Sequence, residues 1–183
     1  LANHKVFVID NMSTGLESNL NSLATYLFED IRDYINDRDI LFNIIKKNNI
    51  QVVYHLAALA DVRLSINDPV KCYNVNQLAS VAILDVCCDM GIKKLVFAST
   101  SAVYGTPIYQ PVDEKHPVGP ISPYGLSKLA FEQYAKYKSS REMEIIVFRL
   151  PNVYGPRQRP DLEGGVVAIF HDLMSGKLLI IEP

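Results

Sequence analysis

"KLVFAST", residues 94 to 100, decides the fold: it is a nearly continuous apolar run that ends in two hydroxyl side chains. Such a run suits a strand buried on both faces of a sheet. Four more runs are of this kind: "KVFVID" (5–10), "ATYLF" (24–28), "VVYHLA" (52–57) and "EIIVFR" (144–149). Longer segments of helical period separate them, such as residues 68–90, which Gly91 follows as a stop signal. Alternating strands and helices predict an α/β fold with a doubly wound parallel sheet, and ligands at the carboxyl ends of its strands.

Composition narrows the function classes. The 183 residues are 49% hydrophobic and 21% charged, which is typical of a globular protein. A net charge of −2 without a basic face argues against nucleic acid, and no apolar stretch approaches the ~18 residues that span a membrane. Three cysteines and four histidines share no metal-ligand spacing, so we expect no metal site and free thiols in a reducing cytosol.

Two tyrosine–lysine pairs stand out in and after "ISPYGLSKLAFEQY" (121–134). Tyr124 and Lys128 are four residues apart, which puts both side chains on one face of a helix. Tyr134 and Lys138 have the same spacing, so the pattern alone does not separate a reactive pair from an ordinary amphipathic helix.

The context of the helix favours the first pair. Ser122 can cap a helix whose first residue is Pro123, which places Tyr124 in the first turn. That turn lies at the same edge of the sheet as Thr100, whereas the second pair lies about 15 Å further along the axis. We therefore predict that the second pair faces solvent.

Tyr124 needs a nearby cation to act as a base. A phenol has a pKa near 10, but a cation about 4 Å away contributes ~4 kcal/mol at an effective dielectric of 20. Lys128 can supply that charge, so Tyr124 could remove a proton from a substrate hydroxyl that Thr100 also binds. Hydride would leave the same substrate carbon for a nicotinamide.

"VIDNMSTG" (8–15) predicts the adenosine site of a dinucleotide. Asp10 follows a strand and can accept hydrogen bonds from the ribose, and its charge favours NAD over NADP. Asp30 and Ile31, at the next strand end, are candidates for the adenine. A strand-ending turn at Asp10 and a helix cap at Asp30 remain open alternatives.

The Gly-rich turn that binds the pyrophosphate is expected about 20 residues before the ribose carboxylate. The chain begins nine residues before Asp10, so we expect a fragment at its amino end, interrupted in the centre of its sheet. By this interpretation the chain alone would be inactive.

Seven stretches, in order, resemble the extended short-chain dehydrogenase/reductase family and its UDP-glucose 4-epimerase-like group. They are "VIDNMSTG", "EDIRD", "VYHLAALADVRLSINDP", "NVNQLASVAILDV", "KLVFASTSAVYG", "SPYGLSK" and "FRLPNVYGPRQ". The resemblance implies a catalytic set of Thr100, Tyr124 and Lys128. It implies that Tyr124 and Lys128 also contact the cofactor, together with Asp10, Asn11, Ser13, Thr14, Gly15, Asp30, Ile31, Leu56, Ala57, Ala58, Asn76 and Pro151. It implies substrate contacts by Thr100, Ser101 and Asn152.

The resemblance also implies a domain division, with an NAD-binding domain over residues 1–160 and the start of a truncated substrate domain over 161–183. It implies an NAD-dependent epimerase of a nucleotide sugar, such as UDP-glucose and UDP-galactose, and a homodimer built on the helices predicted over 68–90 and 123–140. Pro151 stands where an aromatic residue is common in the family. A decarboxylase, a dehydrogenase, a 4,6-dehydratase or a non-catalytic remnant remain alternatives, although a dehydratase needs an acid beside Thr100, where this chain has Ser101.

Overall fold

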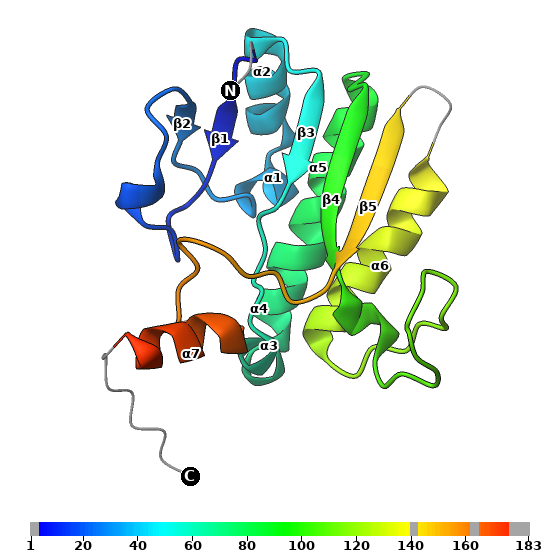
Figure 1. The fold of residues 1–183 in the computed structure, drawn as a ribbon. Coiled ribbons are helices and arrows are strands. Elements are labelled where there is room, and N and C mark those ends of the chain that lie inside the picture. The colour runs from blue at the N-terminus through cyan, green and yellow to red at the C-terminus, as the bar shows by residue number, and fades with distance from the viewer. Residues whose placement is uncertain (1–3, 140–142, 162–164, 176–183) are drawn as a thin grey trace. The chain divides into compact units, whose positions relative to one another are not determined.

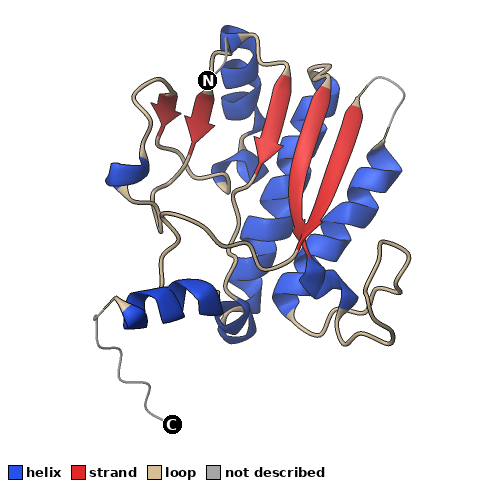
Figure 2. Ribbon diagram, in the orientation of Figure 1, coloured by secondary structure: helices blue, strands red, loops and turns tan. Residues whose placement is uncertain are grey.

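The computed structural model describes residues 4–139, 143–161 and 165–175. The chain packs as two compact units, Leu1–Arg149 and Leu150–Pro183. The first unit contains the sheet strands and the helices that cover them (Figures 1 and 2). The second contains one described helix, α7 (Val166–Met174). The domain boundary expected at residue 160 concerns the whole protein and stays a prediction.

Five strands occupy the five apolar runs that the sequence singled out. They are β1 (Phe7–Ile9), β2 (Thr25–Leu27), β3 (Val52–His55), β4 (Lys94–Thr100) and β5 (Glu144–Leu150). β1 pairs with β2, and β3 with β4, both in parallel. The predicted parallel α/β fold is therefore confirmed.

The strands form two sheets, one of β1 and β2 and one in the order β3-β4-β5. Within the described ranges, no strand is hydrogen-bonded between β1 and β3. This agrees with the interruption that the sequence predicted for the centre of the sheet. One edge of β1 and one edge of β3 therefore form no ladder hydrogen bonds in the described ranges.

The helices of the first unit occupy the predicted crossover segments. They are α1 (Asp33–Asn36), α2 (Arg38–Asn48), α3 (Val62–Asn67), α4 (Pro69–Tyr73), η2 (Asn74–Leu78), α5 (Ala79–Asp89) and α6 (Pro123–Lys138), with short 3-10 turns η1 (Glu17–Asn19) and η3 (Ser101–Tyr104). The long helix predicted over 68–90 is thus one helical stretch with a π turn, η2, in its middle. Gly91 follows it with a φ of +63°, a left-handed conformation that suits glycine.

The expectation that the strands are buried on both faces is wrong for the outer strands. Tyr54 on β3 is 68% exposed and Phe148 on β5 is 51% exposed, whereas Leu95 and Phe97 on β4 are fully buried. The reason is topological. The order β3-β4-β5 runs in one direction, so right-handed crossovers place α5 and α6 on the same face of the sheet (Figure 1).

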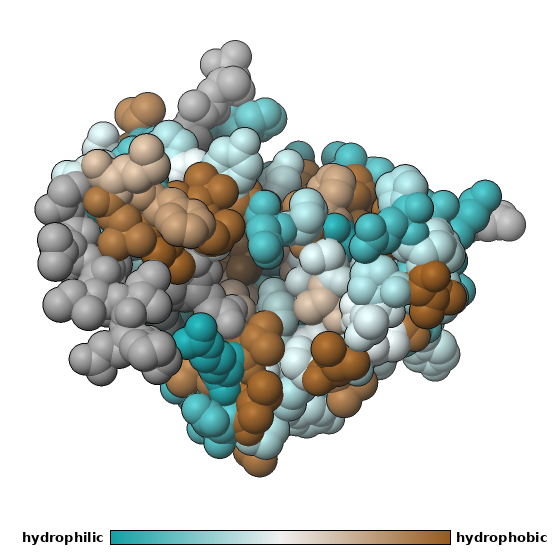
Figure 3. All heavy atoms as spheres, turned by 60° about the horizontal axis from the view of Figure 1, so that its bottom comes forward, coloured by the Kyte–Doolittle hydropathy of each residue, from teal (hydrophilic) through white to brown (hydrophobic). Residues whose placement is uncertain are grey.

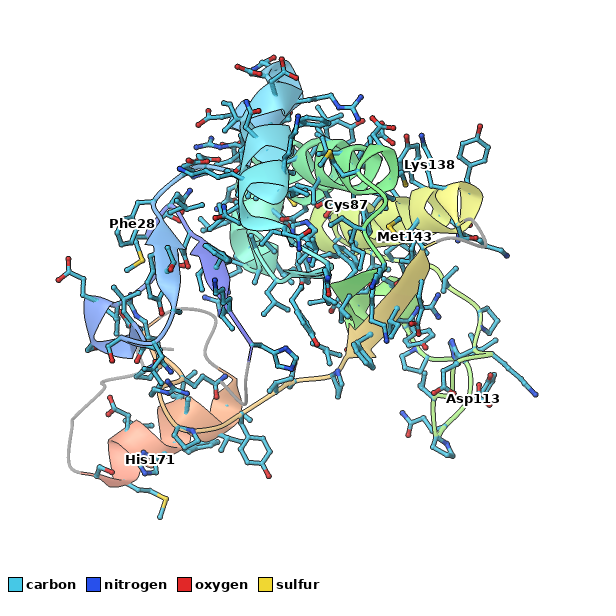
Figure 4. All side chains as sticks on the ribbon, turned by 90° about the horizontal axis from the view of Figure 1, so that it is seen from above. Phe28, Cys87, Asp113, Lys138, Met143 and His171 are labelled. Carbon is cyan, nitrogen blue, oxygen red and sulfur yellow. The ribbon has the colours of Figure 1, made fainter. Side chains whose placement is uncertain are left out.

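The hydrophobic core lies between that face and the helices. The rings of Phe97 on β4 and Phe131 on α6 are 4.0 Å apart between centroids, and Leu84 on α5 is fully buried in the same cluster. Burying each such side chain stabilises the fold by about 1.5 to 3 kcal/mol. Seen from above, Cys87 lies among the helices, whereas Phe28 lies at the outside beside β2 (Figure 4).

Membrane and metal signals are also absent from the part of the chain that the structure describes. None of its helices is long and apolar enough to cross a bilayer. No group of three or more His, Cys, Asp or Glu residues there is placed to hold a metal ion. The three cysteines are free thiols, as predicted.

Candidate active site

The first turn of α6 is built as its sequence predicted. Pro123 is the first helical residue, and the Ser122 hydroxyl accepts a hydrogen bond from the Gly125 amide at 3.1 Å. The Tyr124 amide donates to the hydroxyl of Ser65 on α3 at 3.2 Å. Ser65 is fully buried, and sequence analysis did not identify it. The amide groups at this helix start are therefore satisfied, which fixes the backbone of Tyr124.

Gly125 brings this turn against the end of β4. A Cβ at Gly125 would lie 2.7 Å from the carbonyl oxygen of Ala102 in η3. Thr100 caps η3, because its Oγ1 accepts a hydrogen bond from the Ala102 amide at 3.1 Å. The close approach that glycine permits thus places Tyr124 and Thr100 on adjoining turns, as the sequence predicted.

Lys128 is a buried cation one turn after Tyr124. Its side chain is 2% exposed, and its Nζ donates to the carbonyl oxygen of Ala98 at 2.9 Å. The same Nζ lies 4.6 Å from the centroid of the Phe97 ring. Burial lowers the pKa of Lys128 from 10.5 to about 8. At pH 7 the side chain therefore carries a charge that little water screens, which is what a nearby phenol needs in order to lose its proton.

The prediction that Tyr134 and Lys138 face solvent is wrong. Tyr134 is half-buried against the core, and its hydroxyl donates to Asp85 Oδ1 on α5 at 3.0 Å. Lys138 forms an ion pair with the same carboxylate at 2.9 Å. Burial and the Asp85 carboxylate raise the pKa of Tyr134. This pair therefore joins two helices, and its tyrosine is a poor candidate for a base.

Asn76 was expected to contact the cofactor directly, but its side chain is fully buried within the protein. It is fully buried in η2, where its Oδ1 accepts from the Leu59 amide at 2.8 Å and its Nδ2 donates to the Leu59 carbonyl at 3.0 Å. Nδ2 also lies 3.2 Å from the Ser127 hydroxyl on α6. The Asn76 amide thus links the loop after β3 to α6. Leu56, Ala57 and Ala58, which are predicted to contact the cofactor, begin that loop, and Leu56 is exposed.

The "NMSTG" turn after β1 is shaped by its own side chains. Asp10 Oδ1 accepts from the Met12 amide at 2.8 Å, and Asn11 Oδ1 accepts from the Ser13 amide at 3.0 Å. These successive Asx turns place Met12 at a φ of +55°. The remaining predicted residues of this turn, Thr14 and Gly15, are exposed.

The turn reaches the end of β2. The Asn11 Nδ2 donates to Asp30 Oδ2 at 2.9 Å, so the predicted ribose and adenine candidates do come together. Asp30 also binds Arg32 in a 2.7 Å ion pair and accepts its backbone amide, and these contacts hold the pKa of Asp30 well below its usual range. Ile31 is buried in the core, so its side chain is not available to a ligand. Asp30 thus forms a local turn with Arg32, but it does not cap α1, whose N-cap residue is Arg32.

The other predicted ligand contacts divide between the two units. Ser101 begins η3 next to Thr100 and is exposed. Pro151 and Asn152 belong to the second unit, where both are exposed, and their predicted contacts stay predictions. In that unit Gln158 donates to the Val153 carbonyl at 3.1 Å. Figure 3 shows one face of the molecule, on which hydrophobic and polar side chains are both exposed.

The chain matches a family and individual proteins over nearly its whole length. The model of the NAD dependent epimerase/dehydratase family matches residues 1–181. A putative UDP-glucose 4-epimerase of Methanocaldococcus jannaschii is 44% identical over 174 residues, which are 94% of this chain and 55% of that protein. The chain thus spans about half the length of this curated relative.

Two solved structures are similar in fold. One is the UDP-glucose 4-epimerase of Thermotoga maritima with UDP-glucose, at a TM-score of 0.89 and 34% identity, covering 100% of this chain and 59% of that one. The other is the UDP-glucose 4-epimerase of Thermus thermophilus in complex with NAD, at a TM-score of 0.85 and 37% identity, covering 96% and 56%.

Proposed function

The chain belongs to the NAD-dependent epimerase/dehydratase family, and from this premise we propose that the natural gene product is an NAD-dependent UDP-glucose 4-epimerase. The observation that carries the proposal is the first turn of α6. There Tyr124, the buried ammonium of Lys128 and the Thr100 turn are held together by Ser65 and by the close approach at Gly125. The named activity of the similar proteins supports the choice of a UDP-hexose as substrate.

The described residues fit the adenosine end of NAD. Asp10 is exposed at the carboxyl end of β1, where its carboxylate can accept hydrogen bonds from ribose hydroxyls. The two Asx turns hold the backbone that follows in a fixed shape beside Asp30. When bound, NAD would take a hydride from the sugar and return it.

The protein's own residues handle the proton and the orientation. Tyr124 removes the proton of the sugar 4-hydroxyl, and the Lys128 charge stabilises its phenolate before and after that transfer. Thr100 binds the same hydroxyl and orients it. The 4-keto sugar would have to turn over in the site so that its opposite face is presented, and Tyr124 would then give the proton back. No net oxidation occurs, as an epimerisation requires.

A 4,6-dehydratase is less well supported by the residues around Thr100. That reaction needs an acid to expel water, and the residues that follow Thr100 in η3 are Ser101, Ala102 and Val103. These side chains offer a hydroxyl but no carboxylate.

The proposal is tested by assay of the natural gene product with UDP-galactose and NAD. We expect UDP-glucose to form, and neither free sugar nor a 4-keto-6-deoxy sugar to accumulate. A purified, folded product that binds UDP-galactose without interconverting it would contradict the proposal. Accumulation of a dehydrated sugar would assign the protein to the dehydratase branch of the family.

We also propose a homodimer that pairs α4–α5 and α6 across a two-fold axis. Val70, Leu126 and Tyr137 are 67%, 59% and 81% exposed on these helices, an apolar surface that a second copy could cover. A hollow of about 550 Å³ lies between α4–η2 and the start of α6, lined among others by Tyr73 and Ile121. Sedimentation should give a dimer, and Tyr137→Glu should weaken it. A pure monomer at micromolar concentration would contradict this interface.

A further inference from the structure

Arg149, near the end of β5, forms an ion pair with the carboxylate of Glu132 on α6. Its Nη2 lies 2.7 Å from Glu132 Oε2, and its Nε lies 3.1 and 3.2 Å from the two carboxylate oxygens. The Ser99 hydroxyl donates to Glu132 Oε1 from the end of β4. The guanidinium also lies 4.9 Å from the ring centroid of Tyr104. Glu132 is 8% exposed, so these contacts hold its carboxylate in a nearly dry site.

Glu132 shares a helix face with the proposed base. It lies one turn after Lys128 and two turns after Tyr124, and side chains four residues apart on a helix are neighbours. Positions 128 and 132 are neighbours on one helix face, so a Glu132 carboxylate that Arg149 did not hold could turn toward the Lys128 ammonium. In the part of the chain that the structure describes, no carboxylate forms an ion pair with Lys128. Its Nζ bonds to a backbone carbonyl instead.

The other ionisable groups that face Lys128 are neutral at pH 7. From α4, Cys72 faces it with a thiol whose pKa is raised by burial. From β3, His55 faces it with an imidazole whose pKa burial and the Lys128 charge lower to about 3. On the far side of the ion pair, Tyr104 belongs to η3 and contacts Arg149. Glu132 is therefore the group on this face whose charge could oppose that of Lys128.

We propose that Arg149 is a positioning residue: by holding the Glu132 carboxylate toward β5, it leaves the Lys128 ammonium to act on Tyr124. The inference rests on the proposed function in one respect, which is that Tyr124 is the base. It deepens that proposal by naming the residue that keeps an anion on the same helix from cancelling the cation the base needs.

The ionisation of Tyr124 is the direct measurement. Ultraviolet difference titration detects tyrosinate, and subtracting the curve of Tyr124→Phe isolates this one phenol. In Arg149→Gln we expect its midpoint to move upward by about one pH unit, because the Glu132 charge now opposes that of Lys128. In Glu132→Gln, which keeps an acceptor for Ser99, the uncompensated Arg149 charge should move the midpoint downward. The double variant should restore it.

Opposite movements distinguish an electrostatic role from a merely structural one, which would move both single variants alike or neither. An unmoved midpoint in Arg149→Gln, or a double variant that does not restore it, overturns the proposal. If Arg149→Gln does not fold, Glu132→Gln is the deciding variant. The proposal requires the ionisation midpoint of Tyr124 to fall in that variant, and a midpoint that does not fall overturns it.

Two controls complete the test. Arg38→Gln breaks the exposed 2.9 Å ion pair with Asp89 and should leave the midpoint unchanged. Arg149→Lys keeps the charge and should also leave it nearly unchanged. If Arg38→Gln moves the midpoint as far as Arg149→Gln does, the specific role of Arg149 is refuted. Because the titration reads a phenol rather than turnover, it stays informative even if the gene product proves not to be an epimerase.

Discussion

The ammonium of Lys128 donates a 2.9 Å hydrogen bond to the carbonyl oxygen of Ala98, two residues before Thr100 on the same strand. This bond fastens α6 to β4, the strand that ends at Thr100. It is made by a charge that the interior disfavours, since burial lowers the pKa of Lys128 from 10.5 to about 8. A charge held at a cost to stability is common where function requires it.

Replacing Lys128 by methionine should therefore stabilise the fold and abolish activity. Below pH 8 the side chain is charged in both the folded and the unfolded protein, and burying that charge costs about 3 kcal/mol. Loss of the bond to Ala98 offsets about 1 kcal/mol of the gain. Between pH 8 and 10.5 the folded protein loses the Lys128 proton before the unfolded chain does. The unfolding free energy of the wild type should therefore rise relative to that of the variant as pH rises. Urea titrations from pH 7 to 10 measure the difference, and a wild type that is the more stable at pH 7 would contradict this account.

Tyr124→Phe should lower turnover by ~10²-fold or more, because it removes the proposed general base. Tyr134→Phe is the matched control on the same helix. It loses the hydroxyl bond to Asp85, so it should destabilise the fold by about 1 kcal/mol while turnover of the folded protein changes little. Steady-state assays and thermal melts of both variants separate the two effects. Equal losses of turnover would remove Tyr124 from its proposed role.

Local signals allowed much of this site to be predicted from the sequence. The apolar runs located the five strands of the described residues, and the Ser122–Pro123 signal located the start of α6. The bond from Tyr124 to Ser65 was missed because it joins residues 59 apart in the chain, and no local pattern reports such a contact.

The errors have the same origin. The prediction that Tyr134 faces solvent rested on its position along α6, and it is wrong because its partner Asp85 lies 49 residues away, where no local pattern reports the contact. Phe148 was predicted to be buried because its strand is apolar, but the crossover connections decide which face of the sheet the helices cover. Both depend on tertiary packing, which propensity and periodicity do not contain.

Asp10→Ala should narrow the preference of the gene product for NAD over NADP. The carboxylate can accept bonds from both ribose hydroxyls and repels a 2′-phosphate, so its loss weakens NAD binding and relieves the repulsion of NADP. We expect the ratio of the two dissociation constants to fall about tenfold, measured by calorimetry. Asp39→Ala, at the first turn of α2, is the control and should change neither constant. Tighter binding of NADP than of NAD to the unmutated protein would refute the role of Asp10.

His55 should make the fold sensitive to acid. Its Nε2 lies 2.7 Å from the Ser80 hydroxyl, and burial lowers its pKa from 6.5 to about 3. Between pH 6.5 and 3 the unfolded chain binds a proton that the folded protein does not, so stability falls as pH falls, by about 2 kcal/mol at pH 5. His55→Gln keeps a donor for Ser80 but does not titrate. Its unfolding free energy should change by that much less between pH 7.5 and 5, and an identical acid loss in both proteins would exclude His55 as the cause.

Gly125→Ala should lower turnover by separating two turns that each keep their own structure. The new Cβ would lie 2.7 Å from the Ala102 carbonyl oxygen. Because the group it meets is backbone rather than a flexible side chain, the clash is not relieved by a change of rotamer. The start of α6 would have to move away from η3, at a cost of about 1 to 3 kcal/mol, and Tyr124 would move with it away from Thr100. We expect kcat to fall at least tenfold while binding of UDP-glucose changes less, since a small displacement of a base affects the transition state most. Gly119→Ala is the matched control, because nothing lies within 4 Å of a Cβ at that position. Full activity in Gly125→Ala would mean that the approach of α6 to η3 does not set the geometry of the two side chains.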